Sequence, residues 1–298
     1  MQLATEPTPD RSDAPRRFTR WEYQKMADAG VFGESERVEL LDGEVVTMSP
    51  EGTRHAAFVR RLIRILAREV ADRAEAAYRA GAVPLASAEG FIRQLIGWRE
   101  YVWGLYWLEP PSYASLNELA ATRPLPQAFT GAAETRMECV KACLDGIEER
   151  SWLHHIQRLM VLGNLSLLAG VRPQEVTSWM WERFVDGAEW VMVPNVIGMS
   201  LYADGGRMAT KPYAAGGAYL SRMSTYCKSC TFDHKQRVGE NACPFTTLYW
   251  DFILRHAERF AGNHRMVRQV RAAEQLSDRS AVRLRATQVL ALLDEGRL

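Results

Sequence analysis

Helical spacing dominates the sequence from Gly81 to its end, and this feature narrows the fold more than any other. In EGFIRQLIGWREYVWGLYWL, apolar side chains recur every three or four residues. They form one predicted stripe of Phe91, Leu95, Trp98, Val102 and Leu105. Further helices are predicted in TRMECVKACLDGIEER, HHIQRLMVLGNLSLLAG, PQEVTSWMWERFVDGAEWV and LYWDFILRHAERF, the third of them stopped at Pro194. The pattern predicts a mainly α fold.

The first 81 residues have a different character. Residues 1–15 are polar, carry three prolines and show no period, so we expect a disordered lead. Helical spacing follows from Phe18 to Gly33, and ERVELLDGEVVTMSP then alternates around Asp42-Gly43 as a two-strand hairpin does. An arginine-rich amphipathic helix is predicted over residues 55–81. The sequence therefore predicts a small α+β fragment ahead of the helical part.

Composition excludes several classes of protein. Hydrophobic residues make up 47% of the 298 residues and charged residues 24%, as in an ordinary globular protein. The net charge of +1 gives no global attraction to nucleic acid, so any such binding depends on local patches. No apolar run is long enough to span a membrane, and the first thirty residues lack the apolar core of a signal peptide. We therefore expect a cytoplasmic protein without a membrane partner, and the sequence predicts no protein partner.

Cysteine spacing indicates a metal centre. Cys227 and Cys230 have CxxC spacing, and Cys243 follows in the same loop region, which spans residues 195–247. Two thiolates at this spacing can bind one metal, because the turn between them brings both sulfurs to the same side. One reading is a zinc site completed by His234 or Cys139, and the other is an iron–sulfur cluster held by four thiolates. Spacing alone favours zinc slightly, and thiols that bind no metal are a third reading.

Several blocks then resemble a known family. EGFIRQLIGWREYVWGLYW, HHIQRLMVLGN, PNVIGMSLYADGG, MATKPYAAGGAYLSRMSTYCKSC and GENACPFTTLYWDF are similar, in order, to blocks of the iron–sulfur bacterial cryptochromes and (6-4) photolyases. The resemblance covers about residues 67–298 and implies a helical domain that binds flavin adenine dinucleotide (FAD) and damaged DNA. It also implies a [4Fe–4S] cluster on Cys139, Cys227, Cys230 and Cys243, with Cys143 as a spare thiol.

The same resemblance implies a set of flavin residues. Gln94, Trp98 and Arg99 match the block that lines the flavin and lesion cavity. A second block follows the ring and the ribityl chain, and it contains Asp186, Asn195, Asp204 and Gly205, with Asn195 nearest the N5 side of the flavin. Taken as residues alone, a tryptophan at helical spacing is more often core, and an aspartate before a loop is more often a helix cap.

Histidines and aromatic residues complete the implied site. His154 and His155 open a helix, where a histidine pair usually caps or faces solvent, but the resemblance makes His155 a proton donor to the lesion. Tyr213 and Tyr219 match aromatic residues near the lesion, while Trp179 and Tyr219 match parts of an electron path from the surface. Two departures weaken that path. Met180 stands where the family often has an aromatic residue, and the loop near Gly131 lacks an expected tryptophan.

The segment before residue 67 resembles a different family. RFTRWEYQKMADAGVFGESERVELLDGEVVTMSPEGTRHAAFVRRLIRIL is similar to the start of the Uma2 family, whose fold is restriction-endonuclease-like. The similarity rests on a helix, the hairpin residues Glu39, Leu40, Gly43 and Glu44, and a helix after His55. Later acidic and lysine residues that bind metal in those nucleases have no counterpart. The chain thus reads as a Uma2-like fragment at 16–66 joined near residues 66–70 to a photolyase-type domain.

Three functions follow as hypotheses. The first is light-dependent repair of (6-4) photoproducts in DNA, with this chain as a truncated and inactive fusion in the limiting case. The second is an iron–sulfur DNA-binding or photosensory module without repair, and the third is a Uma2-type nuclease with an incomplete motif. An antenna domain and the serine-rich segment that holds the flavin diphosphate are not recognisable in the sequence, where RRLIRIL stands instead. We therefore expect impaired flavin binding.

Overall fold

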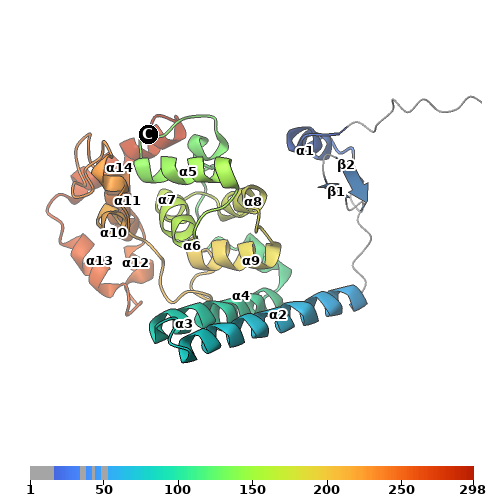
Figure 1. Cartoon of the computed structure of the whole chain (residues 1–298). Helices are drawn as coiled ribbons and strands as arrows, with labels where there is room; N and C mark the ends of the chain where they lie inside the picture. Colours follow the sequence, from blue (N-terminus) through green and yellow to red (C-terminus); the bar gives the residue numbers. More distant parts are fainter. Residues whose placement is uncertain (1–16, 34–37, 42–43, 48–52) are drawn as a thin grey trace, which may run out of the picture. The chain divides into compact units, whose positions relative to one another are not determined.

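A computed structural model describes residues 17–33, 38–41, 44–47 and 53–298 (Figure 1). The chain divides into two compact units, Met1–Phe91 and Ile92–Leu298. The predicted disordered lead, residues 1–15, lies outside the described residues. In the described ranges, none of the helices has the length and apolar character needed to cross a bilayer.

The first unit contains the predicted helix, hairpin and long helix. Helix α1 (Arg20–Asp28) begins with a capping box, in which the Thr19 hydroxyl accepts a hydrogen bond from the Glu22 amide and the Glu22 carboxylate accepts one from the Thr19 amide. Strands β1 (Val38–Leu41) and β2 (Glu44–Thr47) pair antiparallel, with Val38 opposite Thr47. The predicted turn at residues 42–43 lies outside the described residues. Helix α2 (Thr53–Arg79) follows, then α3 (Leu85–Ile92).

The second unit consists of helices and loops, so the mainly α prediction is confirmed. Its core centres on α7 (Asn164–Ala169), in which Leu165 and Leu168 are fully buried. Helix α11 (Pro244–Arg255) packs against α7, α13 and α14 (Figure 1). The other elements of this unit are α4 (Arg99–Leu108), η2 (Pro111–Ser115), η3 (Gln127–Thr130), α5 (Glu138–Arg150), α6 (His155–Gln157), α8 (Pro173–Arg183), α9 (Glu189–Val193), α10 (Gly217–Met223), η6 (Tyr226–Lys228), α12 (Ala257–Phe260), α13 (Val267–Glu274) and α14 (Arg279–Asp294).

Three helices of the second unit contain a π-helical segment. These segments are η1 (Arg93–Trp98) between α3 and α4, η4 (Arg158–Gly163) between α6 and α7, and η5 (Pro194–Ser200) after α9. A π turn bonds residue i to i+5 and widens the helix, and such turns often occur at functional sites. The predicted helices therefore exist but carry turns that a 3.6-residue period does not anticipate.

The predicted stripe is unevenly buried. Val102 is 5% exposed, whereas Phe91 and Trp98 are 48% and 38% exposed. Trp98 and Val102 both line one open cavity, so the exposure of Trp98 does not place it on a different face from Val102. The predicted stripe is therefore buried at Val102 but not along its whole length.

One predicted helix is two. The pattern over residues 173–191 gives α8 and α9 with a turn between them, where the Gly187 amide donates to the Phe184 carbonyl. A Cβ atom on Gly187 would stand 2.4 Å from the Trp181 carbonyl oxygen, so the turn requires glycine. Pro194 does not stop the second helix as predicted, since η5 begins at that proline and continues the helix with π geometry.

Candidate functional site

One cavity of the second unit collects six of the predicted site residues. It has a volume of about 430 Å³. Gln94, Trp98, Arg99, His155, Asn195 and Tyr213 line it together with Val102, Ile156, Leu159, Trp190, Val191 and Met199. Apolar and aromatic walls with a few converging polar groups are typical of a small-molecule site.

All three π-helical segments contribute to this cavity. Gln94 and Trp98 come from η1, Leu159 from η4, and Asn195 and Met199 from η5. Segments η4 and η5 lie very close together, because a Cβ atom on Gly163 would stand 1.9 Å from the Ser200 hydroxyl oxygen. Residues of all three π segments therefore form part of the wall of the same cavity.

His155 is the cavity residue whose pKa is shifted. The residue is exposed, yet the surrounding protein desolvates the imidazolium and lowers the pKa of His155 below 6.5. The charges of Arg158 and His154 lower the pKa of His155 further. At neutral pH the imidazole is therefore mainly uncharged and carries one N–H donor.

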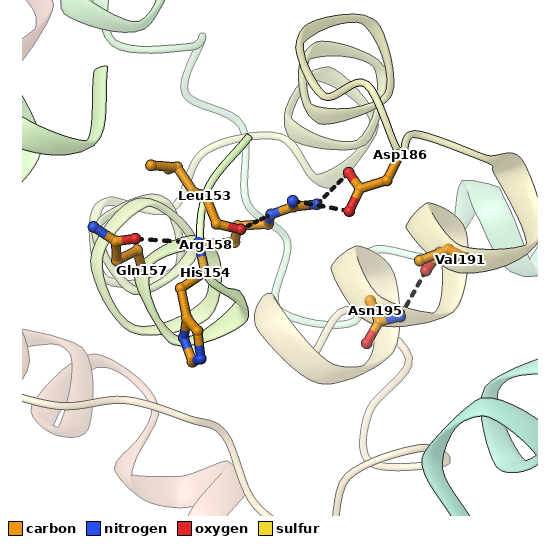
Figure 2. A network of polar contacts seen from close by, with 7 residues as sticks. All are labelled: Leu153, His154, Gln157, Arg158, Asp186, Val191 and Asn195. Atoms are coloured by element: carbon orange, nitrogen blue, oxygen red, sulfur yellow. Dashed lines mark hydrogen bonds and ion pairs between the residues drawn. The ribbon is translucent and has the colours of Figure 1, made fainter. Parts of the chain in front are cut away.

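An ion pair fixes the turn beside the cavity. Arg158 Nη1 and Nη2 donate to the two carboxylate oxygens of Asp186 at 2.8 and 3.0 Å, and its Nε donates to the Leu153 carbonyl at 2.9 Å (Figure 2). The guanidinium also lies 3.9 Å from the centre of the Phe184 ring. Asp186 does not line the cavity. It binds Arg158, which follows His155 by less than one helical turn.

His154 and Tyr219 lie apart from the six residues above. The His154 imidazole caps α6 by accepting a hydrogen bond from the Ile156 amide at 3.1 Å, and the Gln157 side chain accepts one from the His154 amide (Figure 2). Both His154 and Tyr219 line a second cavity of about 400 Å³. Ile156 lines both cavities.

Asn195 and Arg99 have local partners as well as cavity positions. The Asn195 amide nitrogen donates to the Val191 carbonyl at 2.8 Å, which holds the side chain along its own helix (Figure 2). The amide oxygen of Asn195 has no partner among the described residues. Arg99 pairs with Glu100 and is only 22% exposed at its side chain. Both side chains therefore present polar atoms to the cavity from fixed positions.

Asp204 and Gly205 form a tight turn away from the cavity lining. The Asp204 carboxylate is 3% exposed and accepts hydrogen bonds from the Tyr113 hydroxyl and from the Gly206 and Met208 amides, at 2.8 to 2.9 Å. Burial and this carboxylate together raise the pKa of Tyr113. Gly205 has φ +70°, a conformation that favours glycine. Asp204 thereby ties η2 to the loop that leads to Tyr213.

Trp179 lies in the core. Its Nε1 donates to the Phe129 carbonyl at 2.9 Å, and its ring packs on Phe129 and Phe184 at centroid distances of 4.8 and 6.4 Å. The ring is 5% exposed. Trp179 does not line the cavity that holds His155.

Four of the five cysteines meet around a third, small cavity. Cys139 comes from α5, Cys227 from η6, Cys230 from the loop after it, and Cys243 from the N-cap of α11. All four line this cavity with Met137, Phe232 and Phe245, and all are free thiols. Cys143 and His234 do not line it.

Burial controls the chemistry of these thiols. It raises the pKa of Cys139, to which the neighbouring cysteines add, and it raises the pKa of Cys243 to about 11 and that of Cys143 to about 12. Among the described residues, no group of three or more His, Cys, Asp or Glu side chains is placed to hold a metal ion. The four thiols surround a common space without converging as the ligands of one ion do.

Comparison with known proteins decides the relationship. The chain is 47% identical over 228 residues to a (6-4) photolyase of Agrobacterium fabrum, which covers 76% of this chain and 45% of that protein. The model of the Uma2 family, described as a putative restriction endonuclease, matches residues 20–89. Both resemblances are confirmed. The chain spans less than half the length of this photolyase.

A second relative is viral. An uncharacterized protein of Acanthamoeba polyphaga mimivirus is 33% identical over 103 residues, which cover 35% of this chain and 76% of that protein. The chain belongs to the same family as this viral protein over the matched stretch.

For the Uma2-like region, Gly43 lies outside the described residues, as do the side chains of Glu39, Leu40 and His55, while the Glu44 side chain is exposed.

Sequence reasoning missed Trp190, Met199 and Leu159 as cavity residues. Trp190 lay in the predicted helix with Trp179, and nothing in the spacing distinguishes the two rings. One local feature of the sequence could have indicated Trp190 as a cavity residue. Trp190 stands four to five residues before Pro194-Asn195, so a helix that continues through the proline brings Trp190 and Asn195 to the same face.

Proposed function

We propose that this chain is a photolyase-related flavoprotein whose second unit holds the isoalloxazine ring of FAD in the cavity of His155, and which acts on (6-4) photoproducts in DNA. The observation that carries the proposal is the meeting of Gln94, Trp98, Arg99, His155, Asn195 and Tyr213 around one space of about 430 Å³. These residues lie up to 119 positions apart in the sequence, and 47% identity to a (6-4) photolyase supports the assignment.

The donor set suits a flavin ring. Trp98, Trp190 and Tyr213 offer flat apolar surfaces, while the Asn195 amide, the Gln94 amide and the Arg99 guanidinium offer hydrogen bonds at the edges. A bound flavin would supply light absorption and single-electron transfer. The chain's own residues then bind the ring, exclude water from it and supply a proton at His155.

His155 is the proposed proton donor to the lesion. A base extruded from the duplex would enter the cavity mouth, where the imidazole is accessible. Because burial, Arg158 and His154 lower the pKa of His155, protonation of the imidazole needs a drop in pH or a negative charge on the substrate side. An anionic lesion and the DNA phosphates nearby provide such a charge.

We also propose that the second unit binds DNA through basic side chains outside the cavity. We propose Arg207, Lys211 and Arg222 as contacts to DNA phosphates. None of them lines the His155 cavity, and Arg207 pairs with Glu109 at 2.8 Å. Tyr213, in the same loop, does line it. We propose that these basic side chains contact phosphates outside the cavity, so that affinity for DNA falls steeply with salt.

We further propose a [4Fe–4S] cluster on Cys139, Cys227, Cys230 and Cys243. The donor chemistry fits, since four free thiols from α5, η6, the loop after η6 and the N-cap of α11 surround one cavity walled by Met137, Phe232 and Phe245. A four-iron cluster is wider than a single ion, which is consistent with thiols that share a cavity without converging. The alternative is zinc, and metal analysis of anaerobically purified protein distinguishes the two.

One titration tests the proposed function. Anaerobically purified protein is titrated with FAD, and binding is followed by quenching of flavin fluorescence, with Asn195→Ala and Trp98→Ala as cavity variants and Trp152→Phe as an exposed control. We expect saturable binding that both cavity variants weaken and the control preserves. Absence of binding, or binding that the cavity variants leave unchanged, contradicts the proposal.

A module without repair is the second candidate. It is favoured by the match of residues 20–89 to the Uma2 family, which places sequence of another family directly before the elements of the cavity. If the chain binds FAD and DNA but leaves a (6-4) lesion intact under light, with His155→Gln giving the same result as the parent protein, this second function replaces repair. Repair that depends on His155 establishes the first.

A further inference from the structure

Three tryptophans form an unbroken path from the His155 cavity to the surface. Trp190 lines the cavity on α9. Its ring centre lies 5.1 Å from that of Trp103, and the Trp103 ring centre lies 5.6 Å from that of Trp107, both pairs edge to face. These spacings are those of aromatic rings in contact. Trp107 is 60% exposed.

The packing of α4 on α9 builds this path. Trp103 and Trp107 are one helical turn apart on α4, so they occupy the same face. Helix α9 packs against α4 and brings Trp190 to the inner end of the pair. Trp190 is therefore the link between an aromatic face of α4 and the cavity.

The route through Trp179 ends in the core. The Trp179 ring contacts Phe129 and Phe184, which are 3% and 4% exposed, and Met180 is 3% exposed. Phenylalanine gives up an electron far less readily than tryptophan, and position 131 is glycine. Among the described residues around Trp179, no tryptophan or tyrosine ring contact leads outward to solvent.

We propose that Trp190, Trp103 and Trp107 form the route by which an electron from solvent reaches a flavin bound in the His155 cavity. The inference rests on the proposed function. Under light, Trp190 would give one electron to the oxidised ring. Trp103 would then reduce the oxidised Trp190 by one electron, and Trp107 would reduce the oxidised Trp103. A small-molecule reductant in solvent, a thiol or ascorbate, then returns one electron to Trp107. Each tryptophan ends as it began, and the flavin has gained one electron.

The experiment uses the full chain with FAD in excess of its measured dissociation constant. Photoreduction of the bound flavin is followed by loss of its visible absorption under blue light with a thiol present. Trp107→Phe and Trp103→Phe are expected to slow this rate by roughly tenfold or more, whereas Trp181→Phe, an exposed control on α8, leaves it unchanged.

A second readout does not depend on flavin reduction. Without added reductant and under air, illumination should leave oxygen adducts on Trp107, which peptide mass spectrometry detects, and Trp103→Phe should suppress them. The proposal is overturned if FAD binds but Trp107→Phe photoreduces at the parent rate, or if Trp179→Phe alone slows the reaction. If FAD does not bind at all, the proposed function fails with it, and the titration above identifies that cause.

Discussion

Arg158 donates two parallel hydrogen bonds to the carboxylate of Asp186, at 2.8 and 3.0 Å, and so joins η4 to the turn between α8 and α9. The side chain of Arg158 is 13% exposed and that of Asp186 is 51% exposed. The pair therefore stands at the edge of the core, with the positive partner inside. Asp186, which the resemblance placed in a flavin-binding block, therefore binds Arg158 and does not line the cavity.

The first prediction concerns this pair. Asp186→Asn should lower the free energy of unfolding by about 1 kcal/mol, because a partly exposed bidentate pair is lost while Arg158 keeps its bond to the Leu153 carbonyl. Affinity for FAD should change little. Urea denaturation measures the stability and fluorescence titration the affinity. A large loss of FAD affinity at unchanged stability would instead make Asp186 a direct ligand of the flavin.

The second prediction concerns the pKa of His155. Burial is the main cause of its lowered pKa, and the positive charge of Arg158 adds to it. Arg158→Gln should therefore raise the pKa of His155, whereas Arg158→Lys, which keeps the charge, should leave it low. Titration of the imidazole protons by NMR reports this value directly. Equal pKa values in both variants would show that the charge of Arg158 has no effect on His155.

The lowered pKa of His155 affects both stability and repair over the same pH interval. A folded-state pKa below 6.5 means that His155 stabilises the fold fully above about pH 6.5 and that this contribution is lost as the pH falls through the lowered pKa. Repair that uses protonated His155 should increase over the same interval. The two effects oppose each other, so repair assays need a parallel measurement of the folded fraction.

The third prediction concerns the flavin diphosphate. The cavity residues suit the ring, and residues 20–89 match the Uma2 family, so we predict that this stretch supplies no cradle for the diphosphate. Each charge-assisted hydrogen bond lost costs about 1.5–3 kcal/mol. Riboflavin and FAD should therefore bind with dissociation constants within about a factor of ten, a difference of about 1.4 kcal/mol. Asn195→Ala should weaken both ligands alike. FAD binding far tighter than riboflavin would reveal a diphosphate site in this chain.

Element types were largely predictable from the sequence, but the turns within them were not. The hairpin of β1 and β2 followed from alternation around Asp42-Gly43, and the helices from apolar spacing. The π turns depend on tertiary packing, such as the contact of Gly163 with Ser200, which no local pattern encodes. They also moved Trp98 and Gln94 to the cavity wall.

Site residues were predictable only through resemblance. Gln94, His155, Asn195 and Tyr213 are far apart in sequence, and nothing in their spacing brings them together. Trp190 escaped notice for the same reason, because a tryptophan at helical spacing is usually core. Asp204 was placed near a cofactor, and the structure shows its three hydrogen bonds to Tyr113, Gly206 and Met208. The role of Asp204 toward a flavin stays a prediction.

The fourth prediction compares two glycines. A Cβ atom on Gly163 would stand 1.9 Å from the Ser200 hydroxyl oxygen and 3.0 Å from the Arg158 carbonyl oxygen, whereas one on Gly104 would meet nothing within 4 Å. Gly163→Ala should destabilise the protein by about 1–3 kcal/mol through overpacking. Gly104→Ala, within α4, should stabilise it by about 0.5–1 kcal/mol through helix propensity. Urea midpoints of the two variants should therefore shift in opposite directions. Equal shifts would mean that η4 and η5 are not in close contact.

The fifth prediction concerns His256, at the C-terminal end of α11. Its ring lies 4.8 Å from the Phe252 ring centre and 5.9 Å from that of Phe260. Burial in these surroundings, and then the charges of Arg255 and Arg259, lower the pKa of His256 from 6.5 to about 4. The folded state therefore favours the neutral ring, and the unfolded state takes up a proton first as the pH falls.

Stability should accordingly decline as the pH drops from about 6.5 to about 4, and the contribution of His256 should be fully present above that interval. Urea unfolding at a series of pH values measures this slope. His256→Phe should flatten the slope, because the replacement ring has nothing to protonate and suits the contacts with Phe252 and Phe260. Arg259→Gln should narrow the interval by raising the pKa of His256 toward 6.5, since one of the two positive charges is gone. A parent-like slope in both variants would assign the acid sensitivity to other groups, and His155→Gln would then be the variant that removes it.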